Sequence, residues 1–244
     1  MSTTRERVEP AVRAVVSEKE ARQVAESARE TEWTKPSFVR ELFLGRLRLD
    51  LIDPPPSLDP DEQARGGEFL RELDAFVRTV DADAIDATGK VPDAVIDALR
   101  ALGAFGIKIP REYGGLGLSQ TSYNRAIALL STHCSALGVL LSAHQSIGVP
   151  QPLKMFGTEE QKRKYLPRLA KGAISAFALT EADVGSDPAR MGATADPTDD
   201  GEAYVLNGEK LWCTNGPIAE LMVVMAGTPP KPGGKRRGIT AFIV

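Results

Sequence analysis

The sequence predicts an α+β protein in which an α-helical domain, residues 59–172, precedes an antiparallel β domain that begins at residue 173. Two observations predict this order. Apolar residues recur at helical spacing through the first range, and from Ala173 onward the periodicity becomes that of strands separated by Pro, Gly and Asp. The 244 residues allow one large domain or two smaller ones, and 42% hydrophobic residues can form a core.

Residues 1–58 are expected to form a polar leader and a linker. Residues 1–35 are rich in Glu, Arg and Ala. Their acidic content does not suit a mitochondrial transit peptide, and no apolar segment of a signal peptide is present. We expect a solvated or disordered leader, followed by a stiff linker at Asp53-Pro-Pro-Pro56 that no helix crosses.

Charge and cysteine content exclude several classes of protein. The net charge is −3 with both signs interspersed, which argues against a nucleic-acid partner, although residues 231–237 form a local basic loop. No apolar run approaches the ~18 residues of a membrane span. The two cysteines, Cys134 and Cys213, make no disulfide framework and fit a reducing, cytoplasmic location.

Helix signals begin at Asp59, which can cap a helix, with Pro60 in the first turn and Glu62 at capping-box spacing. The apolar stripe of this helix comprises Phe69, Leu70, Leu73, Phe76, Val77 and Val80. A second helix is expected from about Pro92 to Gly103. Its inward side chains are Val95, Leu99 and Leu102.

The glycine-rich residues 112–117 follow no strand and lack G-x-G-x-x-G, so we expect a compact turn rather than a dinucleotide-binding loop. Small and apolar residues over 119–143 predict a helix buried on several sides. His133 and His144 are separated by about three turns and would share one face. Neither has partners at metal-ligand spacing, so both are expected to be structural. Residues 158–161 form a capping box for the next helix.

Strands are expected after residue 173. The candidates are 173–180, 203–207, 209–214, 221–226 and 238–244. Asn207-Gly208 between two of them predicts a tight hairpin.

The first candidate for binding is residues 175–187, Ser-Ala-Phe-Ala-Leu-Thr-Glu-Ala-Asp-Val-Gly-Ser-Asp, a buried strand that ends in a polar loop. The hydroxyl of Thr180 suits the edge of a heterocycle. The backbone N–H groups around Gly185 and Ser186 suit a pyrophosphate or a ligand carbonyl. The alternative is an ordinary hairpin connection.

The second candidate is residues 210–216, Lys-Leu-Trp-Cys-Thr-Asn-Gly. In a strand, Trp212 and Thr214 lie on one face and Cys213 on the other. An indole beside a hydroxyl can pack against a planar aromatic cofactor and hydrogen-bond its rim. The alternative is a tryptophan in a sheet core.

Together the two stretches resemble the signature pair of the acyl-CoA dehydrogenases, Phe-Ala-Leu-Thr-Glu-x-x-x-Gly-Ser-Asp and, about twenty-five residues later, Trp-x-Thr-Asn-Gly. Residues 109–117 and 156–167 extend the resemblance, while 37–45, 142–148 and 239–244 resemble the very-long-chain branch. The resemblance implies an N-terminal helical domain at 59–172, an incomplete, antiparallel barrel-like middle domain at 173–244, and an absent C-terminal helical domain.

The resemblance also implies flavin-dependent α,β-dehydrogenation of acyl-CoA, as in fatty acid β-oxidation, with FAD as cofactor and an electron-transfer flavoprotein as the acceptor. The implied FAD-binding residues are Phe177, Ala178, Leu179, Thr180, Gly185, Ser186, Trp212, Cys213 and Thr214, and Ser186 would also bind acyl-CoA. Small residues over 142–148 would leave room for a long acyl chain.

The chain departs from the family pattern at Ala182, where Pro is usual, and at Cys213, where an aliphatic residue is usual. In the family, the catalytic glutamate and the oligomer interface belong to the C-terminal domain. We therefore assign no catalytic residue and expect chain 1–244 to be inactive alone, with Glu181 in a structural role rather than as a substitute base. Two alternatives stay open, a non-catalytic interaction protein on a truncated dehydrogenase scaffold and an acyl-CoA oxidase.

Overall fold

The computed structural model describes residues 36–54, 57–230 and 237–244. They belong to two compact units, one ending at Pro56 and one beginning at Ser57, and each is described by itself. The leader predicted over residues 1–35, the last prolines of the linker and most of the basic loop lie outside the described residues.

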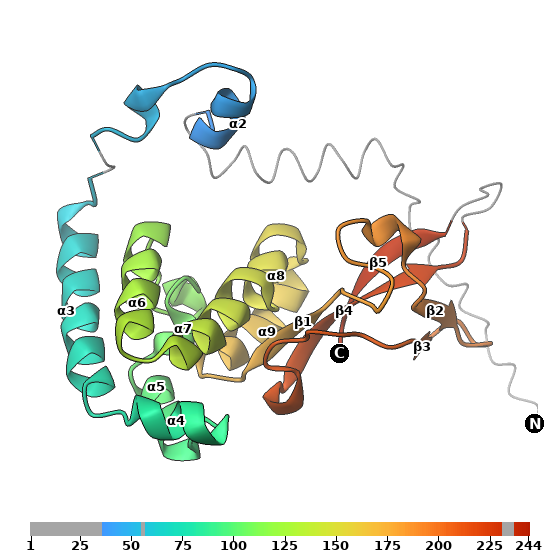
Figure 1. Ribbon diagram of the computed structural model, residues 1–244. Coiled ribbons are helices and arrows are strands. Elements are labelled where there is room, and N and C mark those ends of the chain that lie inside the picture. Colours follow the sequence, from blue (N-terminus) through green and yellow to red (C-terminus); the bar gives the residue numbers. More distant parts are fainter. Residues whose placement is uncertain (1–35, 55–56, 231–236) are drawn as a thin grey trace, which may run out of the picture. The chain divides into compact units, whose positions relative to one another are not determined.

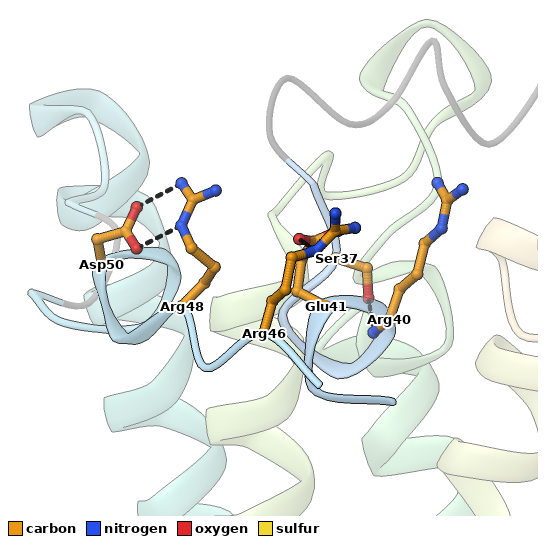
Figure 2. A network of polar contacts seen from close by, with 6 residues as sticks. All are labelled: Ser37, Arg40, Glu41, Arg46, Arg48 and Asp50. Atoms are coloured by element: carbon orange, nitrogen blue, oxygen red, sulfur yellow. Dashed lines mark hydrogen bonds and ion pairs between the residues drawn. The ribbon is translucent and has the colours of Figure 1, made fainter. Parts of the chain in front are cut away.

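The described part of the first unit, residues 36–54, contains the short helix α2 (Phe38–Phe43), a 3-10 turn, η1 (Leu49–Leu51), and two ion pairs. Arg46 reaches back to the buried Glu41, with 2.8 Å between its Nε and the carboxylate. Arg48 binds both oxygens of Asp50, at 2.8 and 2.7 Å (Figure 2). In these planar contacts two nitrogens of a guanidinium bind two oxygens of a carboxylate. They hold the segment that follows α2 to the helix and to its own next turn.

The second unit begins with helices and ends with a sheet (Figure 1). The helices are α3 (Pro60–Val77), α4 (Ala82–Thr88), α5 (Asp93–Ala101), α6 (Gln120–His133), α7 (Ser135–Ser142), α8 (Pro150–Phe156) and α9 (Glu159–Ala170), with a π-helical turn, η4 (Ala143–Ile147), after α7. No helix in the described part of the chain is both long and apolar enough to cross a bilayer.

The start of α3 differs in one respect from the capping box that its sequence predicts. Asp59 accepts the N–H of Glu62 at 3.0 Å, as expected for an N-cap. The Glu62 carboxylate, however, accepts from the N–H of Ser119 at 2.8 Å and from the Ser122 hydroxyl at 3.1 Å. It thereby ties α3 to the start of α6. The capping box at residues 158–161 is confirmed in both directions.

The prediction of a single helix over 119–143 is wrong, because the helix is interrupted at Cys134. This residue takes an extended backbone, with φ −148° and ψ 102°, between α6 and α7. The helical phase is therefore lost between the two histidines, and they share no face. His133 is half-buried, 3.8 Å from a carboxylate oxygen of Asp74, while His144 is fully buried.

The glycine-rich turn at residues 112–117 is confirmed as a compact connection. A Cβ at Gly115 would lie 2.1 Å from the carbonyl oxygen of Ile109, so no other residue fits there. Gly114 adopts a left-handed backbone, with φ +84°. Packing accounts for these glycines without a ligand.

The described strands form one mixed sheet, with β4 at its centre. Its members are β1 (Ser175–Ala178), β2 (Thr194–Pro197), β3 (Tyr204–Asn207), β4 (Leu221–Thr228) and β5 (Gly238–Ile243). β1 and β2 both run parallel to β4, and β5 and β3 add antiparallel partners to β4 and β2 respectively. The predicted antiparallel, barrel-like arrangement is therefore not found among these strands. The long connection between β1 and β4 is what permits their parallel pairing.

The hairpin predicted at Asn207-Gly208 is also wrong. The strand before it, β3, pairs with β2, and the expected strand at 209–214 forms no ladder. A Cβ at Gly208 would lie 2.6 Å from the Cβ of Ala193, and its φ is +146°. The glycine thus serves a close approach between two segments rather than a tight turn.

Two apolar clusters form the core of the second unit. The larger lies among the helices and includes Phe105, Leu73, Leu99 and Leu141. The smaller joins helices to sheet: Val149 and Leu153 of the α8 region and Leu166 and Leu169 of α9 pack with Leu221 and Val223 of β4. The sheet is thereby fixed on the helices, and β1, beside β4, is positioned with it.

Candidate functional site

The first binding stretch leaves β1 and turns sharply. Glu181 and Val184 exchange two backbone hydrogen bonds, of 2.9 and 3.2 Å, which close the turn. Gly185 and Ser186 follow on the surface. The backbone N–H groups of these two residues and of Thr180 donate to no acceptor in the described parts of the chain. Free N–H groups grouped around one loop are donors for an anion or a carbonyl.

The second binding stretch lies alongside the first, although it is not a strand. The N–H of Leu211 donates to the carbonyl of Thr180 at 2.8 Å. Two residues on, the Cys213 thiol lies 3.4 Å from the carbonyl of Phe177. These contacts bring the two predicted stretches together at the end of β1. Burial raises the pKa of the Cys213 thiol, which stays protonated and serves as a donor.

Trp212 stands out of this second stretch into solvent. It is 87% exposed, and its backbone is left-handed, with φ +56°. Such a conformation is unusual for a bulky residue, and the bonds of Leu211 to Thr180 and of Cys213 to Phe177 fix the chain on either side of it. Thr214 is also exposed, and its N–H donates to the carbonyl of Trp212 at 2.9 Å. The alternative of a tryptophan buried in a sheet core is excluded, and an exposed aromatic face remains.

An ion pair ties the two stretches together beneath the surface. Lys210 donates to a carboxylate oxygen of Glu181 at 2.7 Å and to the carbonyl of Leu179 at 3.1 Å. Glu181 also accepts the N–H groups of Gly192 at 2.7 Å and Ala193 at 3.0 Å. Burial alone would raise the pKa of this carboxyl, but the hydrogen bonds from Lys210 and the two amides together lower it below its ordinary value.

At its other end, β1 is bound by a buried histidine. The N–H of Ser175 donates to Nδ1 of His144 at 3.0 Å, and Nε2 lies 3.0 Å from the carbonyl oxygen of Phe105. Because a backbone N–H can only donate and a carbonyl can only accept, the ring is neutral, with its proton on Nε2. Burial lowers the pKa of His144 to about 4, against the opposing influence of the bond to Phe105.

The same junction includes Asn215, whose amide donates to the carbonyls of Leu140 at 3.0 Å and Ser175 at 3.3 Å. Gly148 completes it: a Cβ there would lie 2.4 Å from the His144 carbonyl and 2.5 Å from the Ser175 hydroxyl. Small residues over 142–148 were predicted to leave room for an acyl chain. At Gly148 the space beside the small residue is occupied by the protein's own atoms.

The structure brings all nine predicted cofactor residues to one region, around the end of β1. Four are backbone positions of the strand and its extension, two lie in the surface loop, and three lie in the adjoining stretch. Sequence reasoning did not find Lys210, Asn215 and Ser175. The first two belong to the second motif and the third begins the first motif, so proximity to the motifs was the available signal.

Comparison with known proteins identifies the class. Residues 66–173 match the acyl-CoA dehydrogenase N-terminal domain, and residues 176–244 match the acyl-CoA dehydrogenase middle domain. The chain belongs to the acyl-CoA dehydrogenase family.

Individual relatives agree with this. The chain is 57% identical over 229 residues to the probable acyl-CoA dehydrogenase FadE10 of Mycobacterium tuberculosis H37Rv, covering 94% of this chain and 35% of that protein. It is 42% identical over 217 residues to the mitochondrial very long-chain specific acyl-CoA dehydrogenase of Mus musculus, covering 85% and 32%. A Bacillus anthracis acyl-CoA dehydrogenase solved with FAD has a TM-score of 0.63 at 30% identity, covering 84% and 34%. The chain spans about a third of the length of the curated relatives it matches.

Proposed function

We propose that this chain supplies the N-terminal (59–172) and middle (173–244) domains of a cytoplasmic, FAD-dependent acyl-CoA dehydrogenase. The observation that carries the proposal is the group of free backbone N–H donors at Thr180, Gly185 and Ser186 beside the exposed ring of Trp212. Donors of this kind match the oxygens of a flavin and its pyrophosphate, and an indole matches a flat ring. The residues present therefore fit FAD.

The nine residues named above would hold FAD, with Ser186 also facing acyl-CoA. A bound FAD would supply the hydride acceptor for the reaction. The chain's own part is to orient: Thr180, Trp212 and Thr214 would border the ring, and the backbone of Gly185 and Ser186 would bind phosphate or thioester-chain oxygens. Glu181 is a poor base, because the hydrogen bonds from Lys210, Gly192 and Ala193 hold its carboxylate and lower its pKa.

Substrate length and electron acceptor belong to the same proposal. The similarity to a very long-chain specific enzyme supports a long-chain acyl-CoA, and the family supports an electron-transfer flavoprotein as acceptor. Assembly into a homo-oligomer would depend on the part of the relatives' length that this chain does not span. The preference is tested by comparing palmitoyl- and butyryl-CoA in one assay.

The cofactor proposal is tested by FAD titration of two proteins. One is chain 1–244, and the other is an extended form that also includes whatever its gene encodes after residue 244. Replacing Trp212→Ala together with Thr214→Ala removes the ring contact and a hydrogen bond. We expect about a hundredfold weaker binding, corresponding to a few kcal/mol. Phe156→Ala, which removes an exposed ring from the end of α8, is the matched control and leaves affinity unchanged. An unchanged FAD affinity in the double variant would remove these residues from the site.

A further inference from the structure

The Lys210–Glu181 pair is more enclosed than the other ion pairs of the described chain. Both side chains are only 11% exposed, whereas every other pair has at least one side chain that is 35% exposed or more. Enclosing two charges costs desolvation free energy, which is recovered only with close geometry and further hydrogen bonds. Those further bonds are present, from the amides of Gly192 and Ala193 to Glu181.

The pair also acts on one particular peptide unit. Nζ of Lys210 binds the carbonyl oxygen of Leu179 at 3.1 Å. In a trans peptide the C=O and the following N–H point in opposite directions. With the Leu179 carbonyl turned toward Lys210, the N–H of Thr180 must point away from the ammonium. That N–H is one of the donors of the site that have no acceptor among the described residues.

We propose that Lys210 and Glu181 are positioning residues for the flavin, in that Lys210 sets the orientation of the Leu179–Thr180 peptide and Glu181 fixes Lys210. This inference rests on the proposed function. The ammonium acts through the peptide and need not touch the cofactor. Glu181 in turn anchors the assembly to the segment before β2 through Gly192 and Ala193.

A purely structural ion pair would give a different result from a positioning pair. Loss of a structural pair lowers stability and leaves the affinity of the folded protein for FAD unchanged. Loss of a positioning pair lets the Thr180 N–H rotate, so the folded protein binds FAD less tightly and the visible spectrum of the bound flavin shifts.

The test measures FAD affinity, the bound-flavin spectrum and the thermal unfolding of the apoprotein for Lys210→Met, Lys210→Arg and Glu181→Gln, in the full chain and its extended form. We expect Lys210→Met to weaken FAD binding about tenfold or more and to shift the spectrum, as fits the loss of a charged hydrogen bond that orients a donor. Lys210→Arg keeps a charged donor and restores part of the affinity. Glu181→Gln removes the charge and one of the two accepting oxygens, because the amide nitrogen can only donate, and we expect it to weaken binding about threefold.

The matched control is Lys162→Met, which removes a lysine bound to Glu159 at 2.9 Å on α9, away from the site. It binds FAD as the wild type does. Wild-type FAD affinity and an unchanged spectrum in Lys210→Met, while the Trp212/Thr214 double variant is weakened, would overturn the positioning role and leave the proposed function standing. No FAD binding by the wild type in either form overturns the proposed function itself. If Lys210→Met does not fold, Glu181→Gln decides, since unchanged affinity there overturns the proposal and weaker binding supports it.

Discussion

At its first residue, β1 is held by neutral and fully buried groups, whereas just beyond its last residue the chain is held by an ion pair that water partly reaches. His144 and Ser175 bond at the start, and both have 0% exposure. Lys210 and Glu181 bond beyond the end, each 11% exposed. At each end a side chain bonds a backbone atom. His144 bonds the N–H of Ser175 in the strand, and Lys210 bonds the carbonyl of Leu179 in its extension.

The difference follows from what surrounds each end. At the start, helices and sheet meet around η4, and an unpaired charge there would carry a large desolvation cost, so the groups present are neutral. At the other end the loop opens to solvent, and charged groups can be retained at smaller cost. The neutral end joins the helices to the sheet, and the charged end orients the loop proposed to bind the cofactor. Changes at the first should therefore affect folding, and changes at the second should affect binding.

The largest expected effect is at the neutral end. His144→Ala leaves the Ser175 N–H and the Phe105 carbonyl without partners and opens a cavity in the core. We expect unfolding free energy to fall by about 3–5 kcal/mol in urea titrations. His133→Ala, at the half-buried histidine, is the matched control and should change stability by less than about 1 kcal/mol. A His144→Ala protein within 1 kcal/mol of the wild type would refute the junction's role.

The next effect separates the two ends by pH. The pKa of His144 is lowered to about 4 by burial, while an unfolded histidine titrates near 6.5. As pH falls, the unfolded chain therefore takes up this proton first. The contribution is fully present above about pH 6.5 and is lost between there and about pH 4, an amount of about 3 kcal/mol. Glu181, whose pKa is also lowered, loses its contribution only below the ordinary glutamate range near 4.5.

Denaturant titrations between pH 5 and 6.5 isolate the histidine. His144→Gln should flatten the decline in stability over this range, whereas Glu181→Gln should leave it unchanged. The same slope in wild type and His144→Gln would contradict the neutral state assigned to the buried ring.

The sequence was sufficient where the determining contacts are local. The caps at Asp59 and residues 158–161, the turn at 112–117 and the change from helices to strands depend on neighbours within a few residues. The two stretches proposed to bind the cofactor could be picked out for the same reason. The first stretch carries its N–H donors within a dozen residues, and the second carries the exposed ring.

Some of the failures involve contacts between distant segments, and others involve a local backbone conformation that the residue types do not favour. The parallel pairing of β1 with β4 depends on residues that lie far apart in the chain. Cys134 interrupts the predicted helix although the local residues favour one, and Trp212 has a left-handed backbone in the middle of the predicted strand at 209–214. The Lys210–Glu181 contact joins residues from the two motifs, so no local pattern contains it.

The smallest expected effect is the response of the charged end to salt. A double-mutant cycle of Glu181→Gln and Lys210→Met, measured by the free energy of unfolding, should give a coupling free energy of about 1 kcal/mol or somewhat more at 0.1 M salt. Because the pair is enclosed, raising the salt to about 1 M should lower that coupling by less than half, although the Debye length falls from about 10 to 3 Å.

The same cycle on Asp61 and Arg65, a pair at 2.8 Å whose side chains are 73% and 31% exposed, should start below 1 kcal/mol and lose most of it. A cycle on His144 and Ser175, which carry no charge, should not change with salt. Equal loss in the two ionic cycles would mean that water reaches Lys210 and Glu181 as freely as it reaches a surface pair, and the contrast between the two ends of β1 would not hold.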